Sequence, residues 1–487
     1  FSSSEDLPAN FYNITNRPAP LFTGYDMNLR GLPGVSEPDK LVFPLSKPAD
    51  NARRIESTLD DTLVSPVNHV WNVSWGRELP GGLFVEASYI GRRGRNLMAQ
   101  RDIMAINNLV DPKSGMDWYT AGTQLAKLYE NDTPIENVPA IPYFENLFPD
   151  RSGLIELSQI LYGTDWFTYA GPLNATQQIY ALVTDFNGPD WTYLQHMLQN
   201  WANPIVPYPY YHPQYGTLNT WSTVASSDYH GFTLSARERY KDHLTVDFNY
   251  TWSKSMDNAS GLQNAAAFAA GYILNPHRPD DSRSVSDFDV RHMINANWLW
   301  AVPFGKNRPF LSGMNPWAEA ILGGWEFNGI FRWNSGLPNT SNPFDAGYWA
   351  TNWNVAAAGT RIRHLESSPT KSGDHPNLFA DKTYAYQSYR NAYPGETGDR
   401  NVLRLDGYVA LDFGLGKKFR IPNTENHTLT FRWEVFNATN TQRLGDALSW
   451  YGLGYKPYEG EPSPDFGNIT NIQGSPRVMQ FGLRYDF

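Results

Sequence analysis

The sequence predicts an antiparallel β-barrel that crosses a membrane with its strands, and three observations support this fold class. Segments in which apolar and polar residues alternate recur nine times along the 487 residues. The connections between these segments are alternately long and short. The chain is polar, with a mean hydropathy of −0.49, yet it contains 17 Trp and 28 Tyr. No apolar run is long enough for a membrane-spanning helix, whereas a barrel strand shows lipid only every second residue.

The last predicted strand covers residues 476–487 and ends on an aromatic residue. A period of two places five of its residues on one face, opposite polar residues and glycine: Met479, Phe481, Leu483, Tyr485 and Phe487. This ending resembles the C-terminal signal that the outer-membrane barrel-assembly machinery reads, so these five residues are predicted to form that signal. A strand of a soluble sheet, whose apolar face meets a core, is the alternative.

Eight segments upstream repeat the alternation. Residues 426–437, for example, place Leu429 and Phe431 on one face and Thr430 and Arg432 on the other. Strands of this kind have the length needed to cross a bilayer at a tilt. The predicted strands are 67–78, 83–92, 228–240, 243–255, 291–302, 324–335, 405–418, 426–437 and 476–487.

The connections fall into two classes by length. Transmembrane barrels have short periplasmic turns and long extracellular loops, and here every member of one class is longer than every member of the other. The predicted periplasmic turns are 79–82, 241–242, 303–323 and 419–425, and the predicted extracellular loops are 93–227, 256–290, 336–404 and 438–475. Residues 1–66 are predicted to be a further extracellular loop segment.

Nine strands are an odd number, whereas single-chain bacterial barrels have an even number. Residues 67–487 are therefore predicted to be the C-terminal part of a barrel, which a missing N-terminal portion completes, in a class with about 22 strands. The alternative is a tenth strand within residues 1–66, near Leu41–Leu45, although Pro44 and Pro48 disfavour a strand there.

The loop 93–227 is too long to be a structureless connection. Helical spacing and capping residues predict helices over 117–130 and over 174–184, the latter beginning at the N-cap Asn174, and a third helix after Asp190. The loop is therefore predicted to be a folded lid with its own small core. Aromatic residues in the loops are candidates to stack on a ligand, with packing in a loop core as the alternative: Tyr208, Tyr210, Tyr211, Trp349 and Trp353.

A series of short motifs from about residue 60 to the end resembles the barrel of Oar-like TonB-dependent receptors. In order along the chain, they are Trp71-Asn-Val-Ser-Trp-Gly-Arg-Glu-Leu-Pro80, Tyr89-Ile-Gly-Arg-Arg-Gly-Arg95, Asn249-Tyr-Thr-Trp-Ser-Lys-Ser255, Ser286-Asp-Phe-Asp-Val-Arg-His292, Pro303-Phe-Gly305, Gly323-Gly-Trp-Glu-Phe-Asn-Gly-Ile-Phe-Arg332, Ser335-Gly-Leu-Pro338 and Glu434-Val-Phe-Asn-Ala-Thr-Asn440. The resemblance implies a 22-strand barrel filled by an N-terminal plug, with a TonB box that couples import to the inner-membrane proton gradient. These parts would belong to the missing portion, which is the expected partner of this chain and its link to the TonB complex.

Enzymatic motifs are absent from the sequence. The chain has no Cys, no H-E-x-x-H, no G-x-S-x-G and no phosphate-binding glycine loop. We therefore expect no enzyme activity, no cofactor and no bound metal. The net charge of −10 argues against nucleic acid as a partner. Four histidines near strand ends are expected to pack at the membrane interface rather than to bind metal: His230, His243, His277 and His292.

Two groups of charged residues leave alternatives open. The acidic residues Asp280, Asp281, Asp287 and Asp289 could bind calcium, but the interleaved Arg278, Arg283 and Arg291 favour ion pairing. The arginines Arg92, Arg93 and Arg95 follow a predicted strand to the surface. They either contact outer-membrane lipid and the phosphate of lipopolysaccharide or are simply solvated.

The favoured function is that of a TonB-dependent outer-membrane receptor that binds a ligand through its extracellular loops for import. A structural or surface-assembly protein, whose loops dock other proteins, is the second hypothesis. A barrel protease or lipase is the third. It needs a His beside Asp or Ser at the outer rim, and the sequence offers no convincing set of this kind.

The substitution Leu483→Arg tests the terminal strand. A charge on the lipid face costs about 2–4 kcal/mol near the midplane, so we expect this variant to block barrel assembly. The yield of heat-modifiable barrel on a gel measures the effect, and a normal yield would contradict the predicted lipid-facing position.

Overall fold

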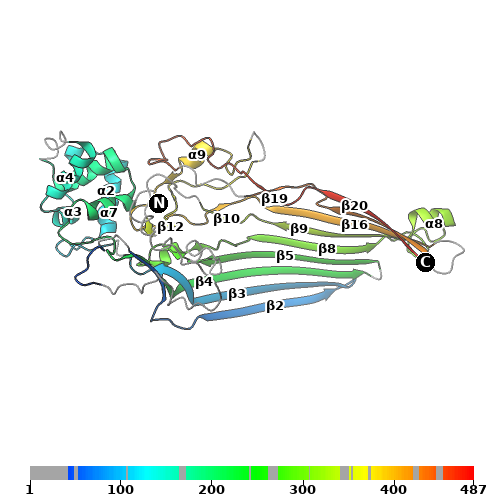
Figure 1. Ribbon diagram of the computed structural model, residues 1–487. Helices are drawn as coiled ribbons and strands as arrows, with labels where there is room; N and C mark the ends of the chain where they lie inside the picture. Colours follow the sequence, from blue (N-terminus) through cyan, green and yellow to red (C-terminus); the bar gives the residue numbers. More distant parts are fainter. Residues whose placement is uncertain are drawn as a thin grey trace, which may run out of the picture.

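The computed structural model describes residues 42–48, 53–105, 108–163, 172–240, 243–260, 272–306, 308–340, 350–352, 355–370, 375–420, 427–445 and 453–487. Its main feature is one long antiparallel sheet in which nine strands pair in chain order (Figure 1). These strands are β2 (Val67–Leu79), β3 (Leu83–Asp102), β4 (Tyr215–Tyr240), β5 (Leu244–Asp257), β8 (His292–Ala301), β9 (Trp325–Asn334), β16 (Tyr408–Arg420), β17 (Thr428–Phe436) and β20 (Val478–Asp486). All nine predicted strands are confirmed, with bounds that shift by a few residues except in β3 and β4.

The pairing register keeps like faces together across the sheet. Phe327, Leu415, Trp433 and Phe481 are successive cross-strand partners on β9, β16, β17 and β20. On the opposite face, the partners are Asn328, Gly414, Glu434 and Gln480. The sheet therefore has one apolar and one polar face, as a membrane barrel requires. The apolar face is open in the described structure, where Phe481 and Leu483 are each 70% exposed.

The two strands β3 and β4 are longer than predicted. Their pairing continues to Asp102 and Asn219, past register shifts between Gly94 and Ala99. These bulges interrupt the period-two pattern, so the alternation in the sequence does not reveal the extension. Beyond the end of β5, the edge of β4 is occupied by the parallel strand β1 (Arg54–Leu59). This strand lies in the segment predicted to be a loop, whereas residues 42–48 contain no strand.

Two further short strands join the sheet. β6 (Tyr272–Ile273) pairs with β3 in parallel, and β7 (Ser284–Val285) pairs with β5. The remaining strands form two-stranded ladders in the loops: β10 (Pro338–Asn339) with β15 (Leu403–Arg404), β11 (Ala350–Asn352) with β12 (Val355–Ala356), β13 (Thr360–Arg361) with β14 (Tyr389–Arg390), and β18 (Arg443–Leu444) with β19 (Ile472–Gln473).

Long and short connections lie at opposite ends of the sheet (Figure 1). The short turns and the end of β20 share one end, where α8 (Pro316–Leu322) fills the longest turn. At the other end, the connection between β3 and β4, residues 103–214, folds into a helical lid. Its helices are α2 (Trp118–Glu130), η2 (Ile135–Asn137), α3 (Pro142–Leu147), α4 (Ser152–Tyr162), α6 (Ala175–Ala181), η3 (Leu182–Asn187) and α7 (Trp191–Asn200). No helix in the described part of the chain is long and apolar enough to cross a membrane.

The predicted lid helices are confirmed. Their starts could be predicted because each capping side chain bonds to a backbone N–H only three residues further along the sequence. Asp117 caps α2 by accepting a hydrogen bond from the N–H of Thr120, and Asp190 caps α7 in the same way. Asn174 forms a full capping box with Gln177 at the start of α6. The helices α3 and α4 were not predicted, because α3 has only six residues and neither begins at a side-chain cap.

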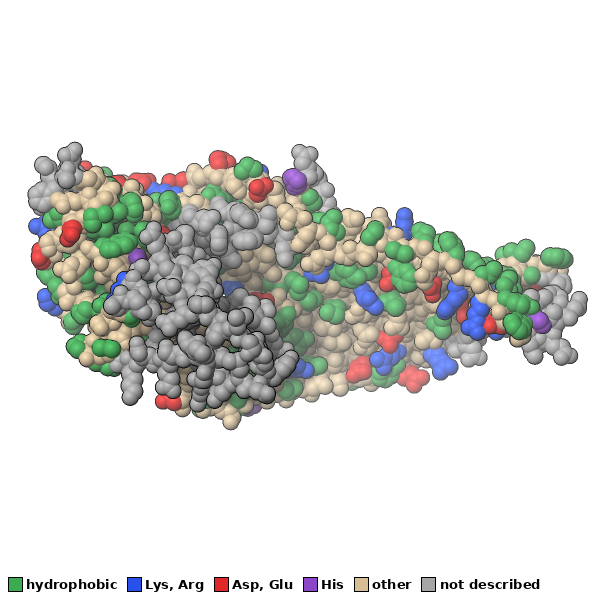
Figure 2. Space-filling model, viewed as in Figure 1, with side chains coloured by type: hydrophobic (Ala, Val, Ile, Leu, Met, Phe, Trp, Pro, Cys, Tyr) green, Lys and Arg blue, Asp and Glu red, His purple; other side chains and the backbone are tan. Residues whose placement is uncertain are grey.

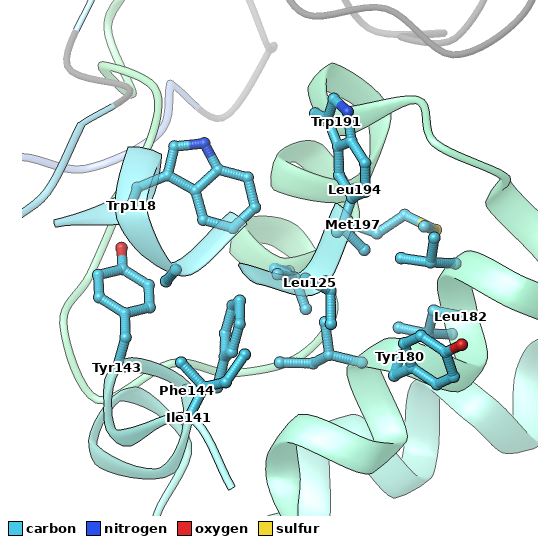
Figure 3. Packing of buried hydrophobic residues seen from close by; sticks show 14 of the residues in the cluster. Trp118, Leu125, Ile141, Tyr143, Phe144, Tyr180, Leu182, Trp191, Leu194 and Met197 are labelled. Atoms are coloured by element: carbon cyan, nitrogen blue, oxygen red, sulfur yellow. The ribbon is translucent and has the colours of Figure 1, made fainter. Parts of the chain in front are cut away.

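The largest buried cluster of the described residues lies mainly in the lid and not in the sheet. Large side chains from α2, α3, α6 and α7 pack against one another (Figure 3), and Trp118, Phe144 and Leu194 have no exposed surface. The ring of Trp118 meets those of Phe144 and Tyr210 edge-on, with centroid distances of 6.1 and 5.2 Å. The lid is thus a folded unit with its own core, as predicted.

A tryptophan covers a glycine at two cross-strand pairs of the apolar face. Trp298 lies opposite Gly329, and Trp71 lies opposite Gly91. A Cβ on Gly329 would come within 2.2 Å of the Trp298 ring, and one on Gly91 within 2.1 Å of the Trp71 ring. Each ring therefore occupies the space above a glycine, in the manner of an aromatic rescue.

The substitution Gly329→Ala should displace the Trp298 ring and lower the free energy of unfolding by about 1–3 kcal/mol. The matched control is Gly416→Ala in β16, where the nearest atom to an added Cβ is the carbonyl oxygen of Phe431 at 3.8 Å. Urea unfolding of the full-length protein in detergent, followed by tryptophan fluorescence, measures both. Equal midpoints for the two variants would contradict the packing argument.

Candidate ligand-binding cap

Four connections gather at the long-loop end of the sheet. They are the lid, the second loop (258–291), the third loop (335–407) and the fourth loop (437–477), and we call them together the cap. The second loop contains the short helix η4 (Pro279–Ser282), and the third contains α9 (Lys382–Tyr386). Their described residues share cores, hydrogen bonds and ion pairs.

The third and fourth loops are packed on a common core. Tyr386 from the third loop meets Phe466 from the fourth edge-on, with ring centroids 5.3 Å apart, while Phe379 stacks on Phe466 at 5.5 Å. The amide of Asn391 donates to the carbonyl oxygens of Gly454 and Tyr455 at 2.9 and 3.1 Å. The two loops therefore form one unit, whose buried members are Leu365, Leu378, Phe379, Ala385, Tyr386, Tyr389, Leu403, Leu405, Leu444, Leu453, Phe466 and Ile469.

This unit meets the lid at the C-terminal end of α2. The Tyr393 hydroxyl donates to the carboxylate of Glu130 at 2.5 Å, across 263 residues of sequence. Just beyond the helix, the Lys456 ammonium pairs with Asp132 at 2.5 Å and lies 5.1 Å from the centre of the Tyr129 ring. Both loops are thus attached to the same end of one helix.

The second loop lies between the lid and the third loop. The Tyr119 hydroxyl donates to the buried side chain of Asn275 at 3.3 Å. The Asn275 amide in turn donates to the carbonyl oxygen of Gly395 at 3.1 Å. A single amide side chain therefore connects three segments of the cap.

Ion pairs connect the second loop to the third. Arg404 bonds to Asp289 at 2.5 Å, and Arg400 pairs with Asp287 at 3.4 Å and also with Asp257 at the end of β5. Ion pairing of the acidic cluster is confirmed for Asp287 and Asp289, but the expected partners were wrong. The arginines come from more than a hundred residues downstream, where no local pattern links them to the acids.

Two of the three arginines expected to pair within the second loop act elsewhere. Arg283 pairs with Asp228 of β4, and Arg278 lies over the Tyr119 ring, 5.1 Å from its centre. Among the described residues, no group of three His, Asp or Glu side chains is arranged to hold a metal ion.

Several ionisable groups in the cap have shifted pKa values. Burial raises the pKa of Tyr393 above its usual range, and the hydrogen bond to Glu130 raises it further. For Arg390, burial is the largest single influence and lowers the pKa, but the hydrogen bonds and negative charge of Glu396, together with Tyr393 and Glu130, raise the net pKa. Burial raises the pKa of Asp190, the N-cap of α7, to about 6. The Tyr393 hydroxyl, which joins the third loop to α2, therefore stays protonated at neutral pH.

The predicted ligand-facing aromatics have different environments. Tyr210 is fully buried in the lid core and presents no surface to a ligand. Tyr211 is half-buried, and its hydroxyl donates to the carbonyl oxygen of Thr192 at 3.1 Å. Tyr208 is half-exposed and accepts a hydrogen bond from the N–H of Lys47 at 3.1 Å. Trp349 and Trp353 lie outside the described residues.

The exposed apolar side chains of the lid were not predicted. Ile160 is 70% exposed, and Trp201 and Phe186 are each 44% exposed. The ring of Trp201 meets His196 edge-on at 5.2 Å, so it is held in place while one side stays open. Figure 2 shows hydrophobic side chains on the surface of the lid. In the sequence, these residues look like members of the helices' buried faces, and only the packing of the lid distinguishes them.

The five residues of the predicted assembly signal lie on one face of β20 and just beyond it. All are exposed, from 47% for Met479 to 91% for Phe487. Phe481 stacks on Trp433 with the ring planes inclined by 6°. The face is therefore formed as predicted, and its role in assembly stays a prediction.

The substitution Arg404→Met should destabilise the cap by about 3–5 kcal/mol, because it leaves a buried carboxylate without its cation. The side chain of Asp289 is 1% exposed and would keep only the hydrogen bond from the N–H of Ser255 at 2.6 Å. The double variant Arg404→Met/Asp289→Asn should recover part of the loss. Hydrogen exchange of the second and third loops measures both, and equal exchange in the two variants would contradict an unpaired charge as the cause.

The chain is similar to several solved outer-membrane proteins. In solved structures, the chain is similar to the outer membrane transporter YddB from Escherichia coli, with 9% identity over 88% of this chain and 33% of that one and a TM-score of 0.32. It is also similar to the FrpB iron transporter from Neisseria meningitidis. For the F3-3 variant, the identity is 7%, the match covers 90% of this chain and 32% of that one, and the TM-score is 0.30. For the F5-1 variant, the identity is 8%, the match covers 90% of this chain and 34% of that one, and the TM-score is 0.32.

The chain thus spans about a third of the length of these structures. Among curated proteins, none matches the chain. The model of one protein family, described as the outer membrane beta barrel domain, matches residues 9–480. This match covers nearly the whole nine-strand sheet and the cap. The chain therefore belongs to the outer membrane beta barrel domain family, and its place in the cell is the outer membrane.

Proposed function

We propose that the chain is the C-terminal barrel portion of a TonB-dependent type of outer-membrane receptor, whose cap faces the cell exterior and binds a ligand for import. The observation that carries this proposal is that the four long connections are joined into one folded cap. A surface that is already ordered loses little conformational entropy when a ligand binds. Long loops that served only to connect strands would not need two shared cores.

The remaining parts of such a receptor would come from the N-terminal portion. In the described sheet, β2 pairs only with β3 and β20 only with β17. Backbone groups at such edges cannot be left unpaired in lipid, which supports strands from that portion at both edges. The polar face of the sheet carries charged pairs such as Arg237 and Asp247, 3.2 Å apart, and suits contact with a plug. Coupling to the TonB complex would reside in that portion too.

The alternative is a surface-assembly role, in which the cap docks other proteins. The exposed side chains of Ile160, Phe186 and Trp201 favour it, since apolar residues on a folded external surface are typical of protein contacts.

We also propose that the protein is not an enzyme. The four histidines considered as candidates are engaged in packing or hydrogen bonds. His230 and His292 bond to the hydroxyls of Tyr89 and Tyr250 at 2.7 and 2.9 Å. His277 bonds to the carbonyl oxygen of Ala105 at 3.1 Å, and His243 meets the Arg308 guanidinium at 2.6 Å. None of these contacts pairs a histidine with a serine nucleophile or an acid.

Removing the lid tests the proposal. Ala105 and Tyr211 form an isolated β-bridge at the base of the lid, so a short Gly-Ser linker can replace residues 106–210 and leave β3 and β4 in place. Cells that produce full-length protein, the lidless variant or no protein are grown in medium with a peptide digest and a polysaccharide hydrolysate. Untargeted mass spectrometry measures which medium components each strain depletes.

We expect a component that only cells with the intact lid deplete, and a protonophore should abolish this depletion. Heat modifiability controls for assembly of the lidless barrel. Identical depletion by all three strains would contradict the receptor, and loss of a cell-surface protein from the lidless strain alone would favour the docking role instead.

A further inference from the structure

Three arginines surround one carboxylate where the apolar face of the sheet reaches the cap. The side chain of Asp228 in β4 pairs with Arg93 and Arg95 of β3 at 3.8 and 3.4 Å, and with Arg283 of the second loop. Three positive groups and one negative group leave a surplus of two positive charges. The chain as a whole carries a net charge of −10, so this local surplus runs against its average.

The cluster lies on the apolar face and not in the lumen. Successive strand residues point to opposite faces, and Arg93 and Asp228 are direct cross-strand partners. In steps of two residues along the strands, the next cross-strand pair is Gly91 and His230, and the pair after it is Tyr89 and Phe232. Tyr89 and Phe232 belong to the apolar face. Arg92, the neighbour of Arg93, points to the other face. Arg93 and Arg95 therefore belong to the cluster, whereas Arg92 does not.

Further basic side chains extend the cluster sideways. His69 of the edge strand β2 is the cross-strand partner of Arg93, and Lys254 of β5 is the partner of His230. Both His69 and Lys254 are exposed. The cluster is thus a band of basic side chains across four strands, with Asp228 as its acidic member.

A row of aromatic and apolar side chains lies directly below this band. Val73, Tyr89, Phe232 and Trp252 are successive cross-strand partners on β2, β3, β4 and β5. Trp252 is 54% exposed and Phe232 is 38% exposed. Aromatic rows on the outer face of a barrel mark the interface between hydrocarbon and headgroups. The cations therefore lie at the depth of the headgroups, on the side of the membrane that the cap occupies.

We propose that this band binds the phosphorylated headgroup of an outer-leaflet lipid of the lipopolysaccharide type. Guanidinium groups bind phosphate with two parallel hydrogen bonds, and the Arg93 side chain is 57% exposed and only 3.8 Å from its acid. It can turn to a phosphate while Arg95 and Arg283 continue to neutralise Asp228. Acyl chains of the same lipid would lie along Phe232 and Trp252. The inference depends on the outward-facing cap of the proposed function but not on import.

The test uses the full-length protein purified in detergent and stripped of lipid. Native mass spectrometry measures binding of lipid A that carries its phosphates, and of the same lipid A after dephosphorylation. The variant Arg93→Gln/Lys254→Gln removes two exposed cations. Arg92→Gln is the matched control, because it removes the same charge one residue away on the opposite face. Arg93→Lys keeps the charge and tests for rescue.

We expect the double variant to bind phosphorylated lipid A roughly 10- to 30-fold more weakly, given the contribution of each cation near a charged lipid surface. Arg92→Gln and Arg93→Lys should bind it nearly as well as the native protein does, and dephosphorylated lipid A should bind weakly to all of them. Equal loss in Arg92→Gln, or unchanged binding in the double variant, would overturn the proposal. Full displacement of lipid A by inorganic phosphate would assign the site to the free anion instead. Intact import in a variant that has lost lipid binding would leave the receptor proposal standing, so the two can fail separately.

Discussion

The register of the nine strands is the constraint on which the rest of the structure depends. A strand has a side-chain period of two, so a slip of one residue would move every apolar side chain to the lumen. The pair of β17 and β20 avoids this slip over its full length, from Thr428↔Asp486 to Phe436↔Val478. The pair of β3 and β4 shifts its register only between Gly94 and Ala99, where the two strands extend toward the cap. Where the side chains opposite one another differ most in size, the larger one covers the smaller, as Trp298 covers Gly329. The apolar face is thereby continuous from strand to strand.

This constraint explains why the chain has its core outside the sheet. A sheet with lipid on one face and polar groups on the other has no interior of its own, and the two large buried clusters of the described residues lie in the cap instead. A small third cluster, Ala99, Ala225 and Ile273, lies where β3 and β4 extend toward the cap. The two long strands β3 and β4 connect these regions, because they continue beyond β2 and β5 and end at the base of the lid. The position of the lid is therefore determined by the same ladder that spans the membrane.

Local rules in the sequence were sufficient for most of this architecture, and long-range contacts account for the rest. The nine strands follow from alternation, and α2, α6 and α7 follow from Asp117, Asn174 and Asp190 at their starts. The strand β1 has no such signal, since it exists only because β4 offers a free edge beyond β5. The pairs Arg400–Asp287 and Arg404–Asp289 likewise depend on how two loops meet. For the aromatics, the sequence cannot separate Tyr210, which is buried, from Trp201, which is exposed.

Lys417 is an exception to the face rule, and its surroundings explain why it is tolerated. It lies on the apolar face of β16, as the cross-strand partner of Phe431 and Trp325. Its ammonium lies 5.3 Å from the centre of the Trp325 ring and 3.4 Å from the carbonyl oxygen of Glu319, in the last turn of α8. The stem thus follows aromatic surface while the charge reaches a helix C-terminus at the rim. Lys417 and the band around Arg93 lie near opposite ends of the sheet, so these positive charges are placed where the strands leave the hydrocarbon.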